Sequence, residues 1–118
     1  MIKASALLTT VLFTAALPVL ASAAGAPKDE AQVKKGQEVY TAQKCSMCHQ
    51  IAGKGNKASP LDGVGAKLSA DDIKQWIVDP AAAAAKAKST KKPPMPAKYK
   101  SLPAADIDAL VAYMQSLK

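Results

Sequence analysis

Five consecutive residues, Cys45-Ser46-Met47-Cys48-His49, determine how this 118-residue sequence is interpreted. The spacing C-x-x-C-H is the attachment pattern of c-type haem. On one turn of helix, residues i and i+3 lie on the same side, so both thiols can reach the two vinyl groups of one porphyrin. The adjacent imidazole of His49 can then bind the iron. The motif therefore predicts one covalent haem c, held by thioether bonds from Cys45 and Cys48.

Other sites built on two cysteines agree less well with the sequence. A thioredoxin-like dithiol belongs in a βαβ unit, and we find no strand pattern around the motif. A structural zinc site needs about four protein ligands and a catalytic site about three, whereas the chain offers two Cys and a single His. Two structural cysteines beside the only His would be a chance arrangement. The sequence favours haem over these three alternatives.

The first 23 residues predict a secretory signal peptide. Lys3 is the only charge before residue 28, an apolar core follows, and Ala21-Ser22-Ala23 is an A-x-A cleavage signal. The uninterrupted core is shorter than the ~20 residues of a spanning helix and is followed by Pro18, which disfavours an uncleaved anchor. We expect cleavage near Ala23, which leaves residues 24–118 as one domain in the periplasm with no stable membrane insertion. Export supports haem, because c-type haem is attached outside the cytoplasm.

The basic residues and the low aromatic content exclude one class of partner and favour a bound cofactor. The net charge of +7 comes from 16 basic and 9 acidic residues, and all 16 basic residues are lysine. A dedicated nucleic-acid reader would normally use arginine, so no nucleic-acid partner is expected. After removal of the leader the chain holds one Trp, three Tyr and no Phe. Such a chain buries a marginal core, which a haem would complete with a large apolar body.

Helical spacing dominates the rest of the chain, and the predicted fold class is all-α with no strands. The last helix has the clearest apolar stripe: Ile107, Leu110, Val111, Met114 and Leu117. The predicted segments are a helix from Asp29 or Glu30 to about Ala42, a loop over residues 53–65, a helix capped by Ser69 and Asp72 that ends at Asp79-Pro80, a helix-forming tract over 81–88, an irregular stretch over 93–96, and a last helix opened by Pro103.

The second axial ligand of the iron is predicted to be Met95. His49 is the only His, so a bis-His site within the chain is impossible. Met47 lies inside the attachment turn, and Met114 lies on the apolar stripe, where Met usually fills the core. Met95 stands in Pro93-Pro94-Met95-Pro96, where prolines restrict the backbone and can present a thioether rigidly. The alternative is that Met95 is an ordinary loop residue.

Taken together, these motifs resemble class I cytochrome c over nearly all of residues 31–118. The residues that carry the resemblance are Gly36 and Tyr40; Cys45, Cys48 and His49; Pro60-Leu61; Trp76-Ile77 and Pro80; Met95-Pro96; and Leu110 and Tyr113. The resemblance implies a cytochrome c fold of helices packed around one haem. It also implies that the first and last helices cross at Gly36, with Tyr40, Leu110 and Tyr113 packed around the crossing.

Two loops depart from the family pattern. Where the family often has Gly-Pro-x-Leu, this chain has Ala58-Ser59-Pro60-Leu61, and a carbonyl there is implied to accept the Nδ1 proton of His49. Lys88-Ser89-Thr90-Lys91-Lys92 replaces the usual Gly-Thr approach to the ligand Met. The resemblance also implies that Trp76 packs on the ring near Met95, although an ordinary core role is equally open.

The predicted function is that of a periplasmic monohaem electron carrier, cycling Fe(III)/Fe(II) with His49 and Met95 as axial ligands, and not an enzyme. Two alternatives are a subunit of a larger periplasmic oxidoreductase and a small haem enzyme of peroxidase type. The latter would want a polar distal residue, and the chain has no second His and no Arg. From residue 80 to residue 105 there are six lysines and no acid, which predicts a redox partner with an acidic docking surface. The alternative is a solvated surface that only aids solubility.

Overall fold

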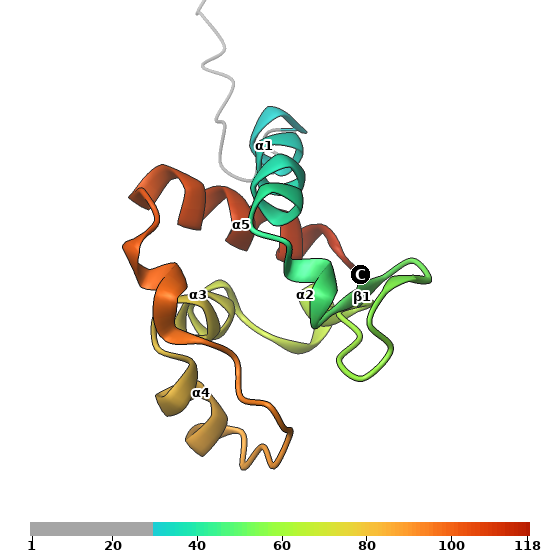
Figure 1. Ribbon diagram of the computed structural model, residues 1–118. Helices are drawn as coiled ribbons and strands as arrows, with labels where there is room; N and C mark the ends of the chain where they lie inside the picture. The colour runs from blue at the N-terminus through green and yellow to red at the C-terminus, as the bar shows by residue number, and fades with distance from the viewer. Residues whose placement is uncertain (1–29) are drawn as a thin grey trace, which may run out of the picture.

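The computed structural model describes residues 30–118, and its first and last helices cross each other (Figure 1). Helix α1 spans Glu30–Ala42 and helix α5 spans Ala104–Ser116. Their pairing is the most extensive between any two elements. Both helices lie where the sequence predicts them. The expected leader and its cleavage site near Ala23 lie outside the described residues.

The crossing depends on Gly36, as expected from the resemblance. A Cβ at this position would collide with the carbonyl oxygen of Ala109 and with the Cβ of Tyr113. The ring of Tyr40 meets that of Tyr113 edge to face next to this contact. An ion pair between Lys35 Nζ and Asp106 Oδ1, at 3.2 Å, also joins the two helices. The two ends of the domain are therefore held together by close backbone packing.

The core lies where α5 packs against α1 and α3 (Ala70–Val78). Its buried cluster is Val39, Ile73, Ile77, Ile107, Leu110, Val111 and Met114. Four of the five stripe residues predicted on the last helix are in this cluster, and Leu117 is half-buried against it. Among residues 30–118, no large side chain is fully buried. The protein part of the core is therefore small.

Helices α3 and α4 (Pro80–Lys86) follow each other with one residue between them. Ser69 Oγ accepts a hydrogen bond from the Asp72 backbone N–H at 3.1 Å, which confirms the predicted cap of α3. Asp79 caps α4 in the same way through its carboxylate, which accepts from the Ala82 N–H at 3.1 Å. Pro80 occupies the first turn of α4, where a missing N–H costs nothing.

Five short elements complete the fold. They are the 3₁₀ turns η1 (Cys45–Met47) and η2 (Ala97–Ser101), the helix α2 (Val64–Lys67), and the antiparallel pair β1 (Gln50–Ile51) and β2 (Lys54–Gly55). The prediction of a chain without strands is wrong at this pair, and α2 begins inside the predicted loop. Strands of two residues are too short to show the alternation of apolar and polar residues that predicts a strand. The turn at Ala52-Gly53, where both residues have positive φ, brings the two strands together.

No helix within residues 30–118 combines the length and apolarity needed to cross a membrane.

Candidate haem site

Cys45 and Cys48 lie on one tight turn, as the spacing predicts. The N–H groups of Cys48 and His49 both donate to the carbonyl of Cys45, at 3.1 and 2.9 Å. Side chains three residues apart eclipse each other on a 3₁₀ turn, so both thiols lie on one side of it. Neither thiol forms a disulfide; Cys45 is half-buried and Cys48 is exposed. Burial raises the pKa of the Cys45 thiol.

The hairpin that follows holds this turn in place. The Asn56 N–H lies 3.1 Å from the Ser46 carbonyl and 3.0 Å from that of His49, and Asn56 Nδ2 donates to the Met47 carbonyl at 3.1 Å. Gly55 lies so close to the His49 carbonyl that a Cβ would collide with it. The sequence places Gly55 and Asn56 in a loop but does not predict their role at the site. The one local indication is the turn-forming composition of residues 53–56.

The imidazole of His49 is oriented by a backbone carbonyl. Its Nδ1 lies 3.1 Å from the carbonyl oxygen of Ser59, which resolves the acceptor among residues 58–61. Because a carbonyl can only accept, Nδ1 carries the proton and Nε2 keeps its lone pair. Burial lowers the pKa of His49, the Ser59 carbonyl opposes this shift, and the charge of Lys91 adds to it. The site therefore favours the neutral imidazole, which is the form that binds metals.

The three methionines of the described chain lie in three different environments. Met47 is 69% exposed and Met114 is buried in the core. Met95 is half-buried in the segment between α4 and η2. This segment contacts the loop that follows the attachment turn, where Lys91 Nζ donates to the Ala58 carbonyl at 2.6 Å. In η2, just after Met95, the pKa of Tyr99 is raised by burial and by the nearby Cys45 and Cys48.

The residues around the turn fit a large apolar group. Several large apolar side chains on the elements that flank Cys45 and Met95 are only half-buried, although the core beside them is closed. They are Leu61, Leu68, Trp76, Met95, Tyr99 and Leu102. Two free thiols on one side of a turn, an imidazole with an available Nε2 and these incompletely covered side chains match the needs of a covalent haem.

The family model described as Cytochrome c matches residues 33–118, which is most of the chain. The chain belongs to the cytochrome c family. Comparisons with curated proteins and with solved structures gave no match. Members of the family bind haem c covalently, so this cytochrome c carries one haem and is a haem electron carrier; Cys45 and Cys48 fit the attachment motif.

Proposed function

We propose that this cytochrome c is a periplasmic monohaem electron carrier whose iron is bound by His49 Nε2 and Met95 Sδ. The observation that carries the proposal is the 3.1 Å contact between His49 Nδ1 and the Ser59 carbonyl. This contact sets the tautomer and the direction of the imidazole, so that Nε2 is the nitrogen available to the iron. When bound, the haem iron supplies a one-electron Fe(III)/Fe(II) couple.

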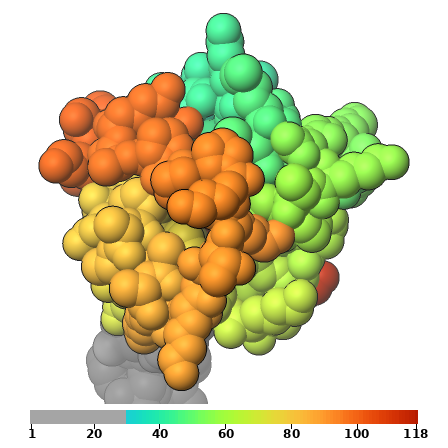
Figure 2. Space-filling view, turned by 60° about the horizontal axis from the view of Figure 1, so that its bottom comes forward, coloured from blue at the N-terminus to red at the C-terminus, as the bar shows by residue number. Residues whose placement is uncertain are grey.

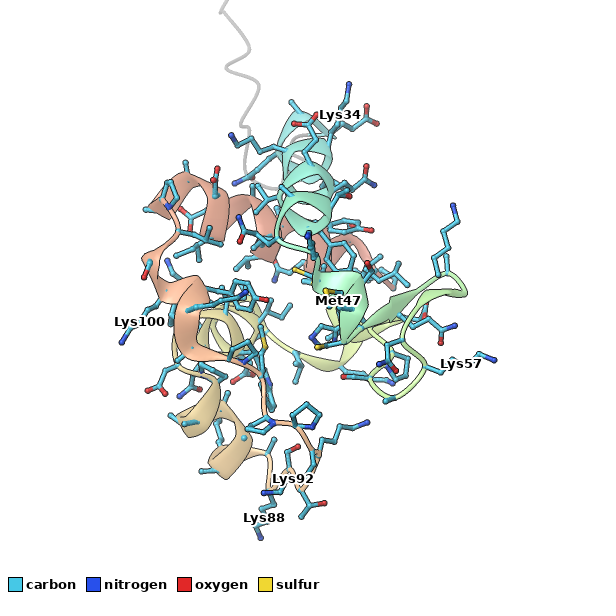
Figure 3. All side chains as sticks on the ribbon, in the orientation of Figure 1. Lys34, Met47, Lys57, Lys88, Lys92 and Lys100 are labelled. Atoms are coloured by element: carbon cyan, nitrogen blue, oxygen red, sulfur yellow. The ribbon has the colours of Figure 1, made fainter. Side chains whose placement is uncertain are left out.

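Met95 is the methionine best suited to the second axial position. Met114 is committed to the core, and Met47 projects to solvent from within the attachment turn (Figure 3). Met95 is half-buried, and three prolines restrict its backbone. The Lys91 contact with Ala58 places its segment against the loop that also supplies the carbonyl facing His49. A thioether ligand raises the reduction potential, and two protein ligands leave the iron no open position for a substrate. This arrangement favours a carrier over a peroxidase-type enzyme.

The ligation is tested by replacing each methionine in the ferric holoprotein. Met95→Ala is expected to abolish the weak near-infrared charge-transfer band that the family resemblance implies for Met-ligated haem, and to admit cyanide rapidly. Met47→Ala is a matched control on the exposed side of the same site and is expected to keep the band. If Met114→Ala abolished the band and Met95→Ala did not, the assignment of Met95 would be wrong.

Export and freedom from a larger complex are part of the same proposal. The leader predicted over residues 1–23, with its cleavage near Ala23, supports a periplasmic location, since haem is attached to c-type cytochromes after export. The mature holoprotein is expected to begin near Ala24 by mass spectrometry and to elute as a monomer from gel filtration. Co-purification with a larger oxidoreductase would favour the alternative of a bound subunit.

A redox partner with an acidic docking surface also belongs to the proposal. Of the six lysines between residues 80 and 105, Lys86 contacts Asp72 Oδ1 at 2.5 Å and Lys91 donates to Ala58. Lys88, Lys92 and Lys100 project outward on the periphery of the molecule (Figure 3). Clustered exposed lysines attract an acidic surface at long range and raise the rate of encounter. Only the Lys86–Asp72 ion pair offsets one of these charges, since the Ala58 carbonyl leaves the charge of Lys91 in place, so the field is weaker by one charge than the sequence alone indicates.

A further inference from the structure

Lys91 is an exposed lysine with an unusual contact. Its Nζ donates a 2.6 Å hydrogen bond to the backbone carbonyl of Ala58, which is 33 residues away in the sequence. In Figure 2 the orange residues of the segment that holds Lys91 lie against the green residues of the loop after the attachment turn. The neighbouring Lys92 is also exposed, and its ammonium group makes no hydrogen bond to any residue of the described part of the chain, 30–118. The contact therefore distinguishes Lys91 from the lysine beside it.

Ala58, whose carbonyl Lys91 binds, and its neighbour Ser59 are linked by hydrogen bonds to two residues of the attachment turn, Met47 and His49. The Ala58 N–H donates to Asn56 Oδ1 at 2.9 Å, and Asn56 Nδ2 donates to the Met47 carbonyl at 3.1 Å. The next residue, Ser59, supplies the carbonyl that orients His49. One continuous series of hydrogen bonds thus runs from Lys91 to the turn that holds the haem thiols.

We propose that Lys91 is a positioning residue that holds the Met95 segment against the loop that follows the attachment turn, through its bond to the Ala58 carbonyl. This inference rests on the proposed Met95 ligation. Pro93, Pro94 and Pro96 stiffen the backbone between Lys91 and the thioether, because each proline fixes its φ angle. A restraint at Lys91 is therefore transmitted to Met95, and its loss increases the fraction of time that the iron lacks the thioether.

The test is the binding of imidazole to the ferric holoprotein, which requires that the Met95 thioether leave the iron. Imidazole is used because it is uncharged at mildly alkaline pH, so the loss of a lysine does not change its attraction to the protein. In Lys91→Ala the binding rate is expected to rise about fivefold to tenfold, because a hydrogen bond from a charged donor is removed. Lys92→Ala removes the same charge from the adjacent position and is expected to bind imidazole at the wild-type rate.

Two further measurements separate the possible outcomes. The folded-to-unfolded ratio measured in urea is expected to fall in Lys91→Ala by no more than the factor seen in imidazole binding, because the lost hydrogen bond restrains one segment only, whereas Lys92→Ala is expected to match the wild type. Equal imidazole rates for the two variants and the wild type, with Met95→Ala binding much faster, would overturn the role of Lys91 and leave Met95 as ligand. If Met95→Ala bound imidazole at the wild-type rate, the proposed ligation and the role of Lys91 would both be wrong.

Discussion

The rings of Tyr40 and Tyr113 meet edge to face, with their centroids 5.8 Å apart and their planes at 81°. Tyr40 lies on α1 and Tyr113 on α5, so this pair joins the two ends of the domain beside the Gly36 crossing. The hydroxyl oxygen of Tyr40 is buried and has no hydrogen-bond partner within residues 30–118. Burial is the main cause that raises the pKa of Tyr40 to about 12. The ring therefore stabilises the crossing while its hydroxyl opposes that stability.

Removing this hydroxyl is expected to leave the protein as stable or more so. Tyr40→Phe keeps the aromatic pair and removes a buried, unpaired polar atom, so the free energy of unfolding should stay constant or rise by up to ~1 kcal/mol. Tyr40→Leu keeps apolar volume but loses the edge-to-face contact and should cost about 1 kcal/mol. Urea denaturation of the holoproteins measures both. A clear loss in Tyr40→Phe would reveal a partner for the hydroxyl.

The same hydroxyl makes stability fall at alkaline pH. The unfolded Tyr40 ionises near its ordinary value of 10.0, whereas the folded group keeps its proton up to about 12. Between these values the unfolded state binds fewer protons, so the free energy of unfolding decreases as pH rises. The decrease should be shallower in Tyr40→Phe, while Tyr99 and Tyr113 contribute equally to both proteins. Urea midpoints at several pH values check this, and parallel curves would contradict it.

The close approach at Gly36 predicts an unusual response to alanine. In an exposed helix interior, Gly→Ala stabilises by about 1 kcal/mol. At Gly36 the new Cβ would meet the Ala109 carbonyl and force α1 away from α5, so Gly36→Ala is expected to lose about 1–3 kcal/mol instead. Gln37→Ala, on the exposed side of the same helix, serves as the control and should change stability little. A gain in stability at Gly36 would show that the helices can separate without cost.

The sequence predicted the long helices because each has a local physical cause. The apolar stripe from Ile107 to Met114 makes α5 amphipathic, and Ser69 satisfies the first free N–H groups of α3. Gly36 was identified through the family resemblance, and the structure gives the physical reason for it. These features depend on neighbours within about one helical turn, or on a single contact with a small residue.

The remaining parts of the site depend on contacts between residues far apart in the sequence. Which carbonyl among residues 58–61 faces His49 is set by the hydrogen bonds that Gln50 makes with Ser59 and Leu61. The bond of Lys91 to Ala58 joins two irregular segments. Neither segment has a periodic pattern, and a backbone carbonyl carries no information about residue type. The contacts of Asn56 with the attachment turn could not be predicted from the sequence for the same reason, because they form only when β1 pairs with β2.

The cap of α3 provides a local test of stability. Ser69→Ala removes the oxygen that accepts from the Asp72 N–H, and the loss of such a cap typically costs ~1 kcal/mol. The same change removes the 2.8 Å hydrogen bond from Ser69 Oγ to Asp72 Oδ2, so the pKa of Asp72, which Lys86 and Ser69 lower, should rise. Ser101→Ala, at an exposed serine of η2, is the control. Urea denaturation measures the stability, and NMR titration measures the pKa of Asp72. A loss of stability with an unchanged pKa would show that Ser69 acts through the backbone cap and not through the Asp72 carboxylate.

The salt dependence of electron transfer tests the lysine surface. The second-order rate with a small, net-negative redox protein is expected to fall by about tenfold between low and physiological ionic strength, because salt screens long-range attraction. Lys92→Glu is expected to weaken this dependence without disturbing the Lys91 contact. Lys34→Glu makes the same change of charge on α1, well away from Lys92 in Figure 3, and should keep the wild-type slope. Equal slopes in all three proteins would mean that these lysines only keep the surface solvated.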